Sequence, residues 1–435
     1  MKLHIEGVVS VPGDKSLTHR ALMLAGAARG ESQLSGLLAG EDCRSTADVL
    51  RALGIEVPDL PGNGSGIVVR SPGINHWTAP VSILDCGNSG TTSRLMMGLL
   101  AGRPFSSTLT GDASLRSRPM RRITDPLTTM GARVTELERP DRLPLELHGG
   151  RLHGIAHHSS KASAQIKSAV IFAGLSGGVD VSVLEPVQSR DHTERMLRSL
   201  GMEVRERPEG DGWLVESRAP AGELPPLDMV VPGDPSSAAF LVALAALADT
   251  GELRVTNVGI NPTRTGFFEA ARRMGVVIEV ENERITGGEP VGDLVVRPGR
   301  LRATEVLGPE VPAMIDEIPV LACLAARAEG ETRITGADEL RAKESDRITA
   351  IVDNLRAIGA DAEELPDGLI VRGSDRPLSG FVRTLHDHRI AMAFGVLAAL
   401  PGNRITIEAP EVADVSYPGF WDTIADLGGG AVVSG

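Results

Sequence analysis

Six helical stretches that each end on a glycine impose the strongest constraint on how this chain can fold. A helix commonly ends at a glycine in the left-handed conformation, and here a strand-like apolar run follows each one. The glycines are Gly54, Gly131, Gly201, Gly275, Gly359 and Gly428. They recur at intervals of 69 to 84 residues, a spacing typical of repeated structural units.

A second signal recurs in phase with the first. Roughly forty residues before each glycine, a polar or Gly-rich turn opens an apolar helix. The turns are marked by Lys15, Asn88, Ser163, Asp234, Asp316 and His388. The two signals predict six units of about 73 residues, each a strand, a buried helix, a strand, an amphipathic helix and further strands.

The helices that follow these turns are apolar on nearly every side, as in "RLMMGLLAG" and "AFLVALAALA". They are predicted to lie inside a domain, with sheets outside them. Their polar first turns offer unpaired N–H groups and the positive end of the helix dipole. Helix starts at equivalent positions favour an anion-binding cleft, although residues that merely cap the helices would leave the same pattern.

The size and composition of the chain agree with this architecture. Its 435 residues with 42% hydrophobic content favour two domains, and 50 glycines with 3% aromatic residues favour an α/β or α+β fold. The formal net charge of -13 argues against a nucleic-acid or anionic-membrane partner. Three cysteines without metal-type spacing, and no apolar segment that suits a leader or a bilayer span, predict a cytoplasmic protein.

One turn occurs twice, as "VPGDKSLTHR" near the N-terminus and as "VPGDPSSAAF" in mid-chain. In the first copy Lys15 and Ser16 stand at a helix start, and Arg20 follows about one turn later. A phosphate or carboxylate there would meet N–H groups, a hydroxyl and two cations. The second copy is predicted to serve mainly as hinge and cap, so that Ser236→Ala is expected to cost about 1 kcal/mol of stability.

Further polar turns suggest contacts to an anionic ligand. The loop "DCGNSGTTSR" resembles an anion nest, in which Gly90 allows a ligand to approach the backbone. Among the arginines of "GDASLRSRPMRR", Arg118 is predicted to point inward, because its fork suits a carboxylate or phosphate. Ser163 and Gln165 at one helix start, and Arg190 at the next, could select a polyol by hydrogen bonds. Capping is the alternative for each of these turns.

The C-terminal half carries acidic and basic groups together. Asp316 stands at the mouth of a strongly apolar helix, the usual setting of a general base. Lys343, Glu344 and Arg347 are predicted at one helix start, with the two cations one turn apart on a shared face, although a solvated salt-bridged face is the alternative. Arg389 opens the last buried helix and needs an anionic partner, while the neighbouring histidines have no spacing that suits zinc.

Ten motifs, taken in order along the whole chain, resemble the 5-enolpyruvylshikimate-3-phosphate synthases. They are "PGDKSLTHRALML", "GNSGTTSR", "GDASLRSRPM", "SAQIKSA", "SRDHTERM", "VPGDPSSAAF", "NPTRTG", "MIDEIP", "RAKESDR" and "DHRIAMAF". The resemblance implies a two-domain inside-out α/β barrel of six βαβαββ repeats, three per domain, with buried parallel helices and closure on the substrates. It also implies a cytoplasmic enzyme without a metal or organic cofactor, expected to be a monomer.

The same resemblance suggests where the chain divides. One domain would span residues 14–230, and the other would combine residues 1–13 with 231–435. The crossovers between them would lie near 11–15 and 229–234.

The implied reaction transfers the enolpyruvyl group of phosphoenolpyruvate to the 5-hydroxyl of shikimate-3-phosphate by addition and elimination, on the route to aromatic amino acids. Asp316 is implied as the base and Glu344 as the proton donor, with Lys15 as an alternative donor. Shikimate-3-phosphate would be held by Lys15, Ser16, Arg20, Ser163, Gln165, Arg190, Asp316 and Lys343. Phosphoenolpyruvate would be held by Lys15, Gly90, Arg118, Gln165, Arg347 and Arg389.

Two positions bear on how far the resemblance extends. Val415 stands where many family members have a lysine that contacts phosphoenolpyruvate, so the contribution of that helix start is in question. Gly90 suggests sensitivity to glyphosate, because insensitive members can carry alanine there.

Two rival functions remain open at this point. UDP-N-acetylglucosamine enolpyruvyl transferases share the fold, but they carry a reactive cysteine in the segment that matches "GDASLRSRPM", where this chain has none. A non-catalytic anion-binding protein is the other alternative, against which the pairing of Asp316 and Glu344 with the cations argues.

Overall fold

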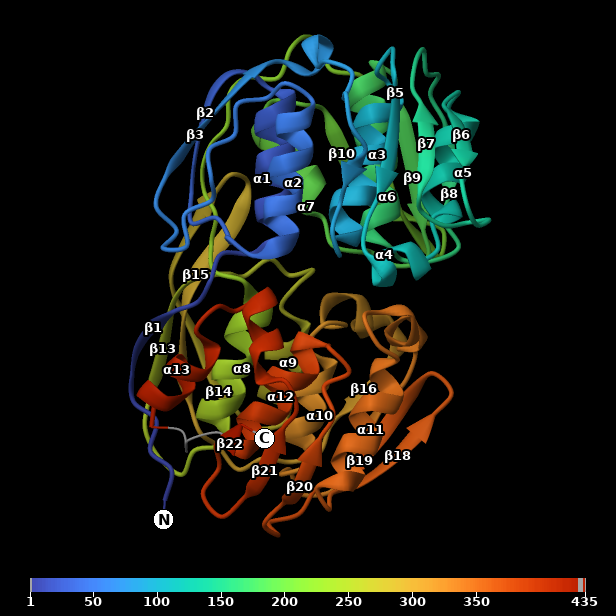
Figure 1. Ribbon diagram of the computed structural model, residues 1–435. Coiled ribbons are helices and arrows are strands. Elements are labelled where there is room, and N and C mark those ends of the chain that lie inside the picture. Colours follow the sequence, from blue (N-terminus) through green and yellow to red (C-terminus); the bar gives the residue numbers. More distant parts are fainter. Residues whose placement is uncertain (1, 429–432, 435) are drawn as a thin grey trace. The chain divides into compact units, whose positions relative to one another are not determined.

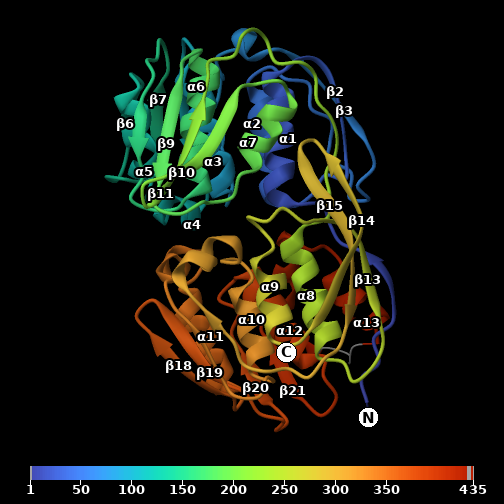
Figure 2. The ribbon, with the colours of Figure 1, turned by 180° about the vertical axis from the view of Figure 1, so that it is seen from behind.

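The computed structural model describes residues 2–428 and 433–434, which form two compact units (Figures 1 and 2). Unit 2 comprises residues 13–231 and 285–289, and unit 1 comprises the other described residues. Both units combine helices with sheets, so the predicted mixed α/β class is confirmed. In the part of the chain that the structure describes, every helix is too short or too polar to cross a membrane.

Unit 2 holds three sheets and a core to which three long helices contribute. The sheets are β12–β2–β3 (Asp228–Val230, Arg29–Ser35, Ile67–Pro72), β4–β5–β7–β6 (Leu84–Asp85, Ser106–Thr110, Leu145–His148, Arg133–Glu136) and β10–β11–β9–β8 (Val204–Glu209, Gly212–Ser217, Val181–Glu185, Ala156–His158). The buried helices are α1 (Lys15–Ala27), α3 (Gly90–Ala101) and α6 (Ala164–Gly177), and the others are α2 (Glu41–Ala52), α4 (Ala113–Ser117), α5 (Arg121–Thr129) and α7 (His192–Ser199). Helices α3 and α6 pack so closely that a Cβ on Gly98 would collide with the Ala169 carbonyl, which explains a glycine in mid-helix.

Unit 1 is built in a similar way. Its sheets are β1–β13–β15–β14 (Gly7–Ser10, Leu253–Gly259, Glu289–Arg297, Val277–Thr286), β16–β17–β19–β18 (Glu305–Val306, Glu331–Ile334, Gly368–Arg372, Asp361–Leu365) and β20–β21–β22 (Ser379–Val382, Arg404–Ile407, Val433–Ser434). The buried helices are α8 (Pro235–Ala246), α10 (Ile318–Ala325) and α12 (His388–Ala398), and the amphipathic ones are α9 (Gly266–Arg273), α11 (Arg347–Ala357) and α13 (Phe420–Asp426). Short 3-10 helices are η1 (Ile74–His76) in unit 2 and η2 (Gly308–Ala313), η3 (Asp338–Ala342) and η4 (Pro410–Val415) in unit 1.

Buried helices connect parallel strands in both units. Within the described strands, α3 joins β4 to β5, α6 joins β8 to β9, α10 joins β16 to β17, and α12 joins β20 to β21. Parallel strands require such a crossover, and a helix covered on all sides must be apolar all round. Every residue of α8 is buried, as the run of Ala, Leu and Val predicts.

The two remaining buried helices, α1 and α8, exchange their leading strands. Strand β1 precedes α1 but pairs with β13, which follows α8. Strand β12 precedes α8 but pairs with β2, which follows α1. The two "VPGD" turns therefore sit where the chain passes from one sheet system to the other.

All six glycines predicted to end helices have the left-handed backbone. Their φ values run from 85° at Gly201 to 116° at Gly131. A residue with a Cβ is strained in this region, so glycine is the residue that closes these helices most easily. The prediction of six helix ends is confirmed.

The β14–β15 hairpin departs from the boundaries predicted from sequence. Its stem belongs to unit 1, whereas its tip, residues 285–289, belongs to unit 2. There the Glu289 carboxylate lies 2.9 Å from Nδ1 of His192, and both side chains are at most 2% exposed. The predicted division assigns everything after about residue 231 to one domain, so it places residues 285–289 in the wrong unit.

Candidate active site

The first predicted turn presents one partly buried and one buried cation in unit 2. Asp14 caps α1 by accepting a backbone N–H of its first turn. The Lys15 ammonium lies 3.1 Å from the Asp42 carboxylate, and the Lys15 side chain remains 18% exposed. Arg20 is only 3% exposed, and its Nη1 donates to the carbonyl oxygen of Ser16 at 3.0 Å. The turn can therefore offer the Lys15 ammonium to a ligand, with the Arg20 guanidinium fixed behind it.

Two hydroxyls from other helices hold Arg20. Its Nε donates to Thr193 Oγ1 at 2.8 Å and its Nη2 to Ser168 Oγ at 3.0 Å, while the two hydroxyls lie 2.7 Å apart. The pKa of Arg20 is lowered to about 10, mainly by burial. Glu194 opposes this shift by its negative charge, while Arg190 adds to it by its positive charge. The guanidinium thus stays charged at neutral pH. Sequence reasoning missed both hydroxyls, which lie far from Arg20 in the chain.

Gly90, Arg118 and Gln165 come together around a residue that sequence reasoning did not select, Arg94. A Cβ on Gly90 would lie 3.1 Å from Arg94 Nη1 and 3.4 Å from Arg118 Nη1. Arg94 is buried and donates to Gln165 Oε1 at 2.6 Å, while Arg118 donates to Asn88 Oδ1 at 2.6 Å. An arginine within the apolar stretch "SRLMMGLL" was the signal that could have found Arg94, because such a residue needs polar partners.

Capping does not account for Ser163. It precedes α6 as the N-cap residue, but its side chain makes no capping hydrogen bond in the described structure. Gln165, in the first turn of the same helix, donates from Nε2 to Thr91 Oγ1 at 3.1 Å. The start of α6 is thereby tied to the start of α3, which carries Gly90.

A buried chain of hydroxyls joins α1, α2 and α3. His19 Nδ1 lies 2.7 Å from Thr46 Oγ1, which lies 2.6 Å from Thr92 Oγ1. Thr92 in turn donates to Ser89 Oγ, the cap of α3, at 2.7 Å. Burial lowers the pKa of His19 to about 3, so this imidazole is neutral at pH 7 and adds no charge beside Lys15. These linked hydrogen bonds fix the three helices relative to one another near their first turns.

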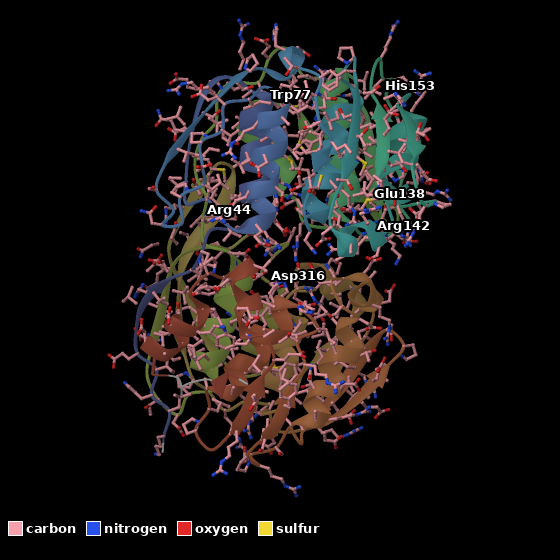
Figure 3. All side chains as sticks on the ribbon, in the orientation of Figure 1. Arg44, Trp77, Glu138, Arg142, His153 and Asp316 are labelled. Atoms are coloured by element: carbon pink, nitrogen blue, oxygen red, sulfur yellow. The ribbon has the colours of Figure 1, made fainter. Side chains whose placement is uncertain are left out.

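In unit 1, three cations surround Asp316 (labelled in Figure 3), which precedes α10. Its Oδ1 lies 3.3 Å from Lys343 Nζ, 3.2 Å from Arg347 Nη1 and 3.9 Å from Arg389 Nε. Arg389 also donates to the Asp316 carbonyl oxygen at 3.2 Å. The Asp316 side chain is 12% exposed, so the carboxylate is within reach of a ligand while its charge is balanced.

Arg347 is the centre of this second cluster. It is 1% exposed and makes a two-point contact with Asp387, at 2.8 Å from Nε and 3.2 Å from Nη2. Its Nη2 also donates to Glu344 Oε2 at 2.6 Å. Burial alone would lower the pKa of Arg347, but Asp387, Glu344 and Asp316 together raise it above its usual range. Asp387, which sequence reasoning did not select, fixes the position of this permanent cation.

The prediction that Lys343 and Arg347 share a helix face is wrong. Helix α11 begins at Arg347 with Asp346 as its cap, whereas Lys343 follows the separate 3-10 helix η3. The N-cap carboxylate of Asp346 accepts the Thr349 N–H, so the helix starts after Asp346 and does not extend back to Lys343 as the charge pattern suggested. The two cations meet because both approach Asp316.

The predicted residues fall into two clusters, one in each unit. The unit 2 cluster comprises Lys15, Ser16, Arg20, Gly90, Arg118, Ser163, Gln165 and Arg190. The unit 1 cluster comprises Asp316, Lys343, Glu344, Arg347 and Arg389. Within residues 2–428 and 433–434, no group of three or more His, Cys, Asp or Glu side chains is arranged to hold a metal ion.

Known proteins match this chain over nearly its whole length. A sequence model described as EPSP synthase (3-phosphoshikimate 1-carboxyvinyltransferase) matches residues 2–424. A protein named 3-phosphoshikimate 1-carboxyvinyltransferase from Desulfitobacterium hafniense (strain DSM 10664 / DCB-2) is 47% identical over 97% of this chain and 95% of its own length. Its namesake from Desulforamulus reducens is 46% identical over 97% of each. The chain belongs to the EPSP synthase family.

Solved structures support membership of the EPSP synthase family. The EPSP synthase from Acinetobacter baumannii superposes with a TM-score of 0.85 at 39% identity, covering 99% of this chain and 97% of that one. The enolpyruvyl transferase NikO from Streptomyces tendae shares the fold, with a TM-score of 0.76 at 20% identity, covering 98% of this chain and 97% of that one.

In this member of the EPSP synthase family, Ser236 of the second "VPGD" turn does not have the capping role that the sequence predicts for it. Asp234 caps α8 by accepting the Ser236 N–H at 2.8 Å. The Ser236 hydroxyl instead donates to the buried Glu317 carboxylate and accepts from Arg264 Nη2 at 2.8 Å, while Arg264 also contacts Asp234 at 3.0 Å. Ser236 therefore belongs to a buried ionic network and does not act as a cap.

Replacing Ser236 by Ala is expected to lower the free energy of unfolding by about 1 to 3 kcal/mol, because Glu317 and Arg264 each lose a buried partner. Urea denaturation followed by circular dichroism measures the change. Ser237→Ala is the matched control, because the Ser237 hydroxyl joins none of these groups. Equal losses in the two variants would contradict the network.

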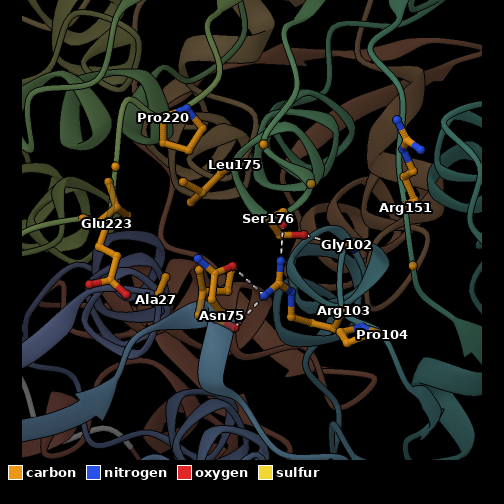
Figure 4. Close-up of a pocket in the computed structure, with 16 residues that line it drawn as sticks. Ala27, Asn75, Gly102, Arg103, Pro104, Arg151, Leu175, Ser176, Pro220 and Glu223 are labelled. Atoms are coloured by element: carbon orange, nitrogen blue, oxygen red, sulfur yellow. Dashed lines mark hydrogen bonds between the residues drawn. The ribbon is translucent and has the colours of Figure 1, made fainter.

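A cavity of about 640 Å³ lies at the other ends of the unit 2 helices (Figure 4). It is lined where α1, α3 and α6 end, by Ala27, Gly102 and Gly177 among others. Arg103 fixes these ends by donating to the carbonyl oxygens of Ile74, at 2.7 Å, and of Ser176. None of the predicted site residues lines this cavity.

Proposed function

We propose that this chain transfers the enolpyruvyl group of phosphoenolpyruvate to the 5-hydroxyl of shikimate-3-phosphate and releases phosphate. The observation that carries the proposal is the nearly full-length match to proteins named 3-phosphoshikimate 1-carboxyvinyltransferase. The relatives are 46% to 47% identical, and the chain retains charged groups of the kinds that this reaction requires.

The unit 2 cluster is proposed to bind the phosphorylated acceptor. Ser16, Arg20, Ser163, Gln165 and Arg190 offer hydroxyls, an amide and cations, which suit a phosphate ester that carries free hydroxyls. The start of α1 adds N–H groups and the positive end of a helix dipole. In unit 1, Asp316 and Lys343 are proposed to contact the same substrate.

Phosphoenolpyruvate carries a carboxylate and a phosphate, and it is proposed to bind to a set of guanidinium groups with Lys15. This set comprises Arg118 in unit 2 and Arg347 and Arg389 in unit 1, assisted by Gly90 and Gln165. Arginine suits both anions because its fork donates two hydrogen bonds at once. Val415, at the end of η4, offers no cation, so the arginines carry this role without a lysine there.

The chemistry is proposed to proceed through addition and elimination. An acid, Glu344 or Lys15, donates a proton to the methylene carbon while Asp316 accepts the proton of the 5-hydroxyl, whose oxygen bonds to the central carbon. The tetrahedral adduct then loses the methyl proton and expels phosphate, which restores the double bond. Fixed cations stabilise the negative charge that the phosphate gains as its bond breaks. The reaction as written requires no metal or organic cofactor.

The finer architecture is part of the same proposal. We propose six βαβαββ repeats in two domains, divided at residues 14–230 and at 1–13 with 231–435 apart from the hairpin tip at 285–289, in an inside-out barrel that closes on the substrates. The strand exchange of β1 and β12 and the six left-handed glycines support this arrangement. A cytoplasmic monomer is proposed. Three buried cysteines that form no disulfide within the described residues suit a reducing compartment.

Phosphate release tests the reaction directly. The purified protein should release phosphate from phosphoenolpyruvate when shikimate-3-phosphate is present and release none when it is omitted. Activity with UDP-N-acetylglucosamine in its place would favour the other enolpyruvyl transferase. Calorimetric binding of shikimate-3-phosphate without turnover would support a non-catalytic anion-binding protein.

Gly90→Ala is expected to raise the KM for phosphoenolpyruvate about tenfold, and to weaken glyphosate inhibition by at least as much. The added Cβ would press on the Arg94 guanidinium at 3.1 Å and would be in contact with that of Arg118 at 3.4 Å. Both effects are measured by phosphate release during titrations of substrate and inhibitor. Gly62→Ala is the control, because a Cβ there meets nothing within 4 Å.

Two results would count against this use of Gly90. One is a wild-type protein whose activity does not change at millimolar glyphosate. The other is a Gly90→Ala protein with the wild-type KM for phosphoenolpyruvate.

A further inference from the structure

A fully buried lysine, Lys167, joins two segments of unit 2 that carry proposed substrate contacts. Its ammonium lies 2.8 Å from Oε1 of Glu185, at the end of β9, and 2.8 Å from Oε1 of Glu194, in α7. It also donates to the carbonyl oxygen of Ser189 at 3.3 Å. The three side chains are at most 1% exposed, so no part of this cluster can contact a ligand directly. Any effect on substrate binding must act through its neighbours.

One set of neighbours holds Arg20. Ser168 follows Lys167 in α6, and Thr193 precedes Glu194 in α7. These two hydroxyls accept hydrogen bonds from the Arg20 guanidinium at 3.0 and 2.8 Å. The ion pair between Lys167 and Glu194 therefore fixes the spacing of the two helices at the point where they grip Arg20.

The other set of neighbours is the turn that leads to Arg190. Glu185 accepts the Ser189 N–H at 2.8 Å and the Ser189 hydroxyl at 2.8 Å. Lys167 contacts both the Glu185 carboxylate and the Ser189 carbonyl. The residue that immediately precedes Arg190 is thus held from two sides by one buried ion pair.

The balance of charge makes Lys167 necessary to this arrangement. Burial alone would lower the pKa of Lys167, but Glu194 and Glu185 raise it above its usual range, so the ammonium stays charged. Glu194 is also the largest of the attractions that keep Arg20 charged. Without Lys167, the buried Glu185 and Glu194 carboxylates would lose the cation that they share, and the attraction between Glu194 and Arg20 would draw the guanidinium from its ligand-binding position.

We infer that Lys167 is a positioning residue that sets the affinity for the phosphorylated acceptor. It orients Arg20 and the turn before Arg190, and it does so without touching substrate. The inference rests on the proposed function, in which Arg20 and Arg190 hold the phosphate ester. It predicts a defect confined to one substrate, because neither the Gly90 and Arg118 contacts nor the unit 1 cluster includes Lys167.

Lys167→Met keeps the length of the side chain and removes its charge. The KM for shikimate-3-phosphate should rise at least about tenfold, the scale of losing a hydrogen bond to a charged group. At saturating substrate, kcat and the KM for phosphoenolpyruvate should stay within about threefold of wild type. A structural defect without a positioning role would lower kcat or change the KM of both substrates alike, and either result would overturn the inference.

Because an unpaired buried carboxylate can prevent folding, Lys167→Met combined with Glu194→Gln is the second variant. It removes both charges of the pair with Glu194 and leaves Glu185 with the Ser189 N–H and hydroxyl as donors, and thermal unfolding establishes that it is folded. The exposed Lys2→Met is the control and should match wild type. A folded double variant with the wild-type KM for shikimate-3-phosphate would overturn the inference, as would failure of both Lys167 variants to fold. A wild-type protein that releases no phosphate would instead refute the proposed function.

Discussion

Asp316→Ala should lower kcat by about 100-fold or more, the usual scale for the loss of a positioned general base. The carboxylate is partly exposed and lies beside Lys343, Arg347 and Arg389, so it is within reach of the acceptor hydroxyl whose proton it is proposed to accept. Its removal leaves Arg347 paired with Asp387, so the cluster should keep its shape. Steady-state phosphate release measures the loss.

The comparison variants separate the loss of the base from damage to the fold. Asp316→Asn keeps the shape of the side chain and should lose as much activity as Asp316→Ala. Asp353→Ala, at an exposed position of α11, should behave like wild type. Near-normal turnover by Asp316→Ala would rule out Asp316 as the base, and Glu344 would then be the next candidate for that role.

Lys15→Ala should lower kcat/KM by about 1000-fold. This is near the upper end of the rate that is lost when one fixed donor that stabilises a developing negative charge is removed. Lys15 is proposed to contact both substrates, and it combines an ammonium with the N-terminal end of α1. The side chain is 18% exposed, so its removal should not disturb the core. Phosphate release at varied concentrations of each substrate measures the effect.

The Asp42 carboxylate provides the diagnostic control, because it holds the Lys15 ammonium at 3.1 Å. Asp42→Asn keeps the side-chain shape and should change kcat/KM by only a few-fold, since the ammonium remains. If Asp42→Asn lost as much activity as Lys15→Ala, the ion pair and not the ammonium would be the functional element.

The helix framework could be predicted from the sequence because its signals are local. Six helix ends are marked by a glycine that can adopt positive φ, and a buried helix such as α8 is marked by an uninterrupted apolar run. The strand exchange between β1 and β12 has no such local signal, because it depends on which distant strand each one pairs with. Its assignment came from the family resemblance.

For the candidate site, the sequence indicated which groups stand at helix starts but not what holds them. Arg20 depends on Thr193, and Arg347 depends on Asp387, across long separations in the chain. Spacing arguments treat neighbours in sequence as neighbours in space, which misled the prediction for Lys343 and Arg347. Because Asp346 caps α11, the helical spacing that such arguments assume does not hold between Lys343 and Arg347.

The hairpin tip at residues 285–289 has a consequence for how the gene can be divided. A fragment that encodes residues 13–231 would omit Glu289 and leave His192 buried without its carboxylate. Such a fragment should fold poorly alone and recover when a peptide that contains the hairpin is supplied in trans. The N-terminal half of the coding sequence should therefore depend on the C-terminal half for folding, well before any substrate is present.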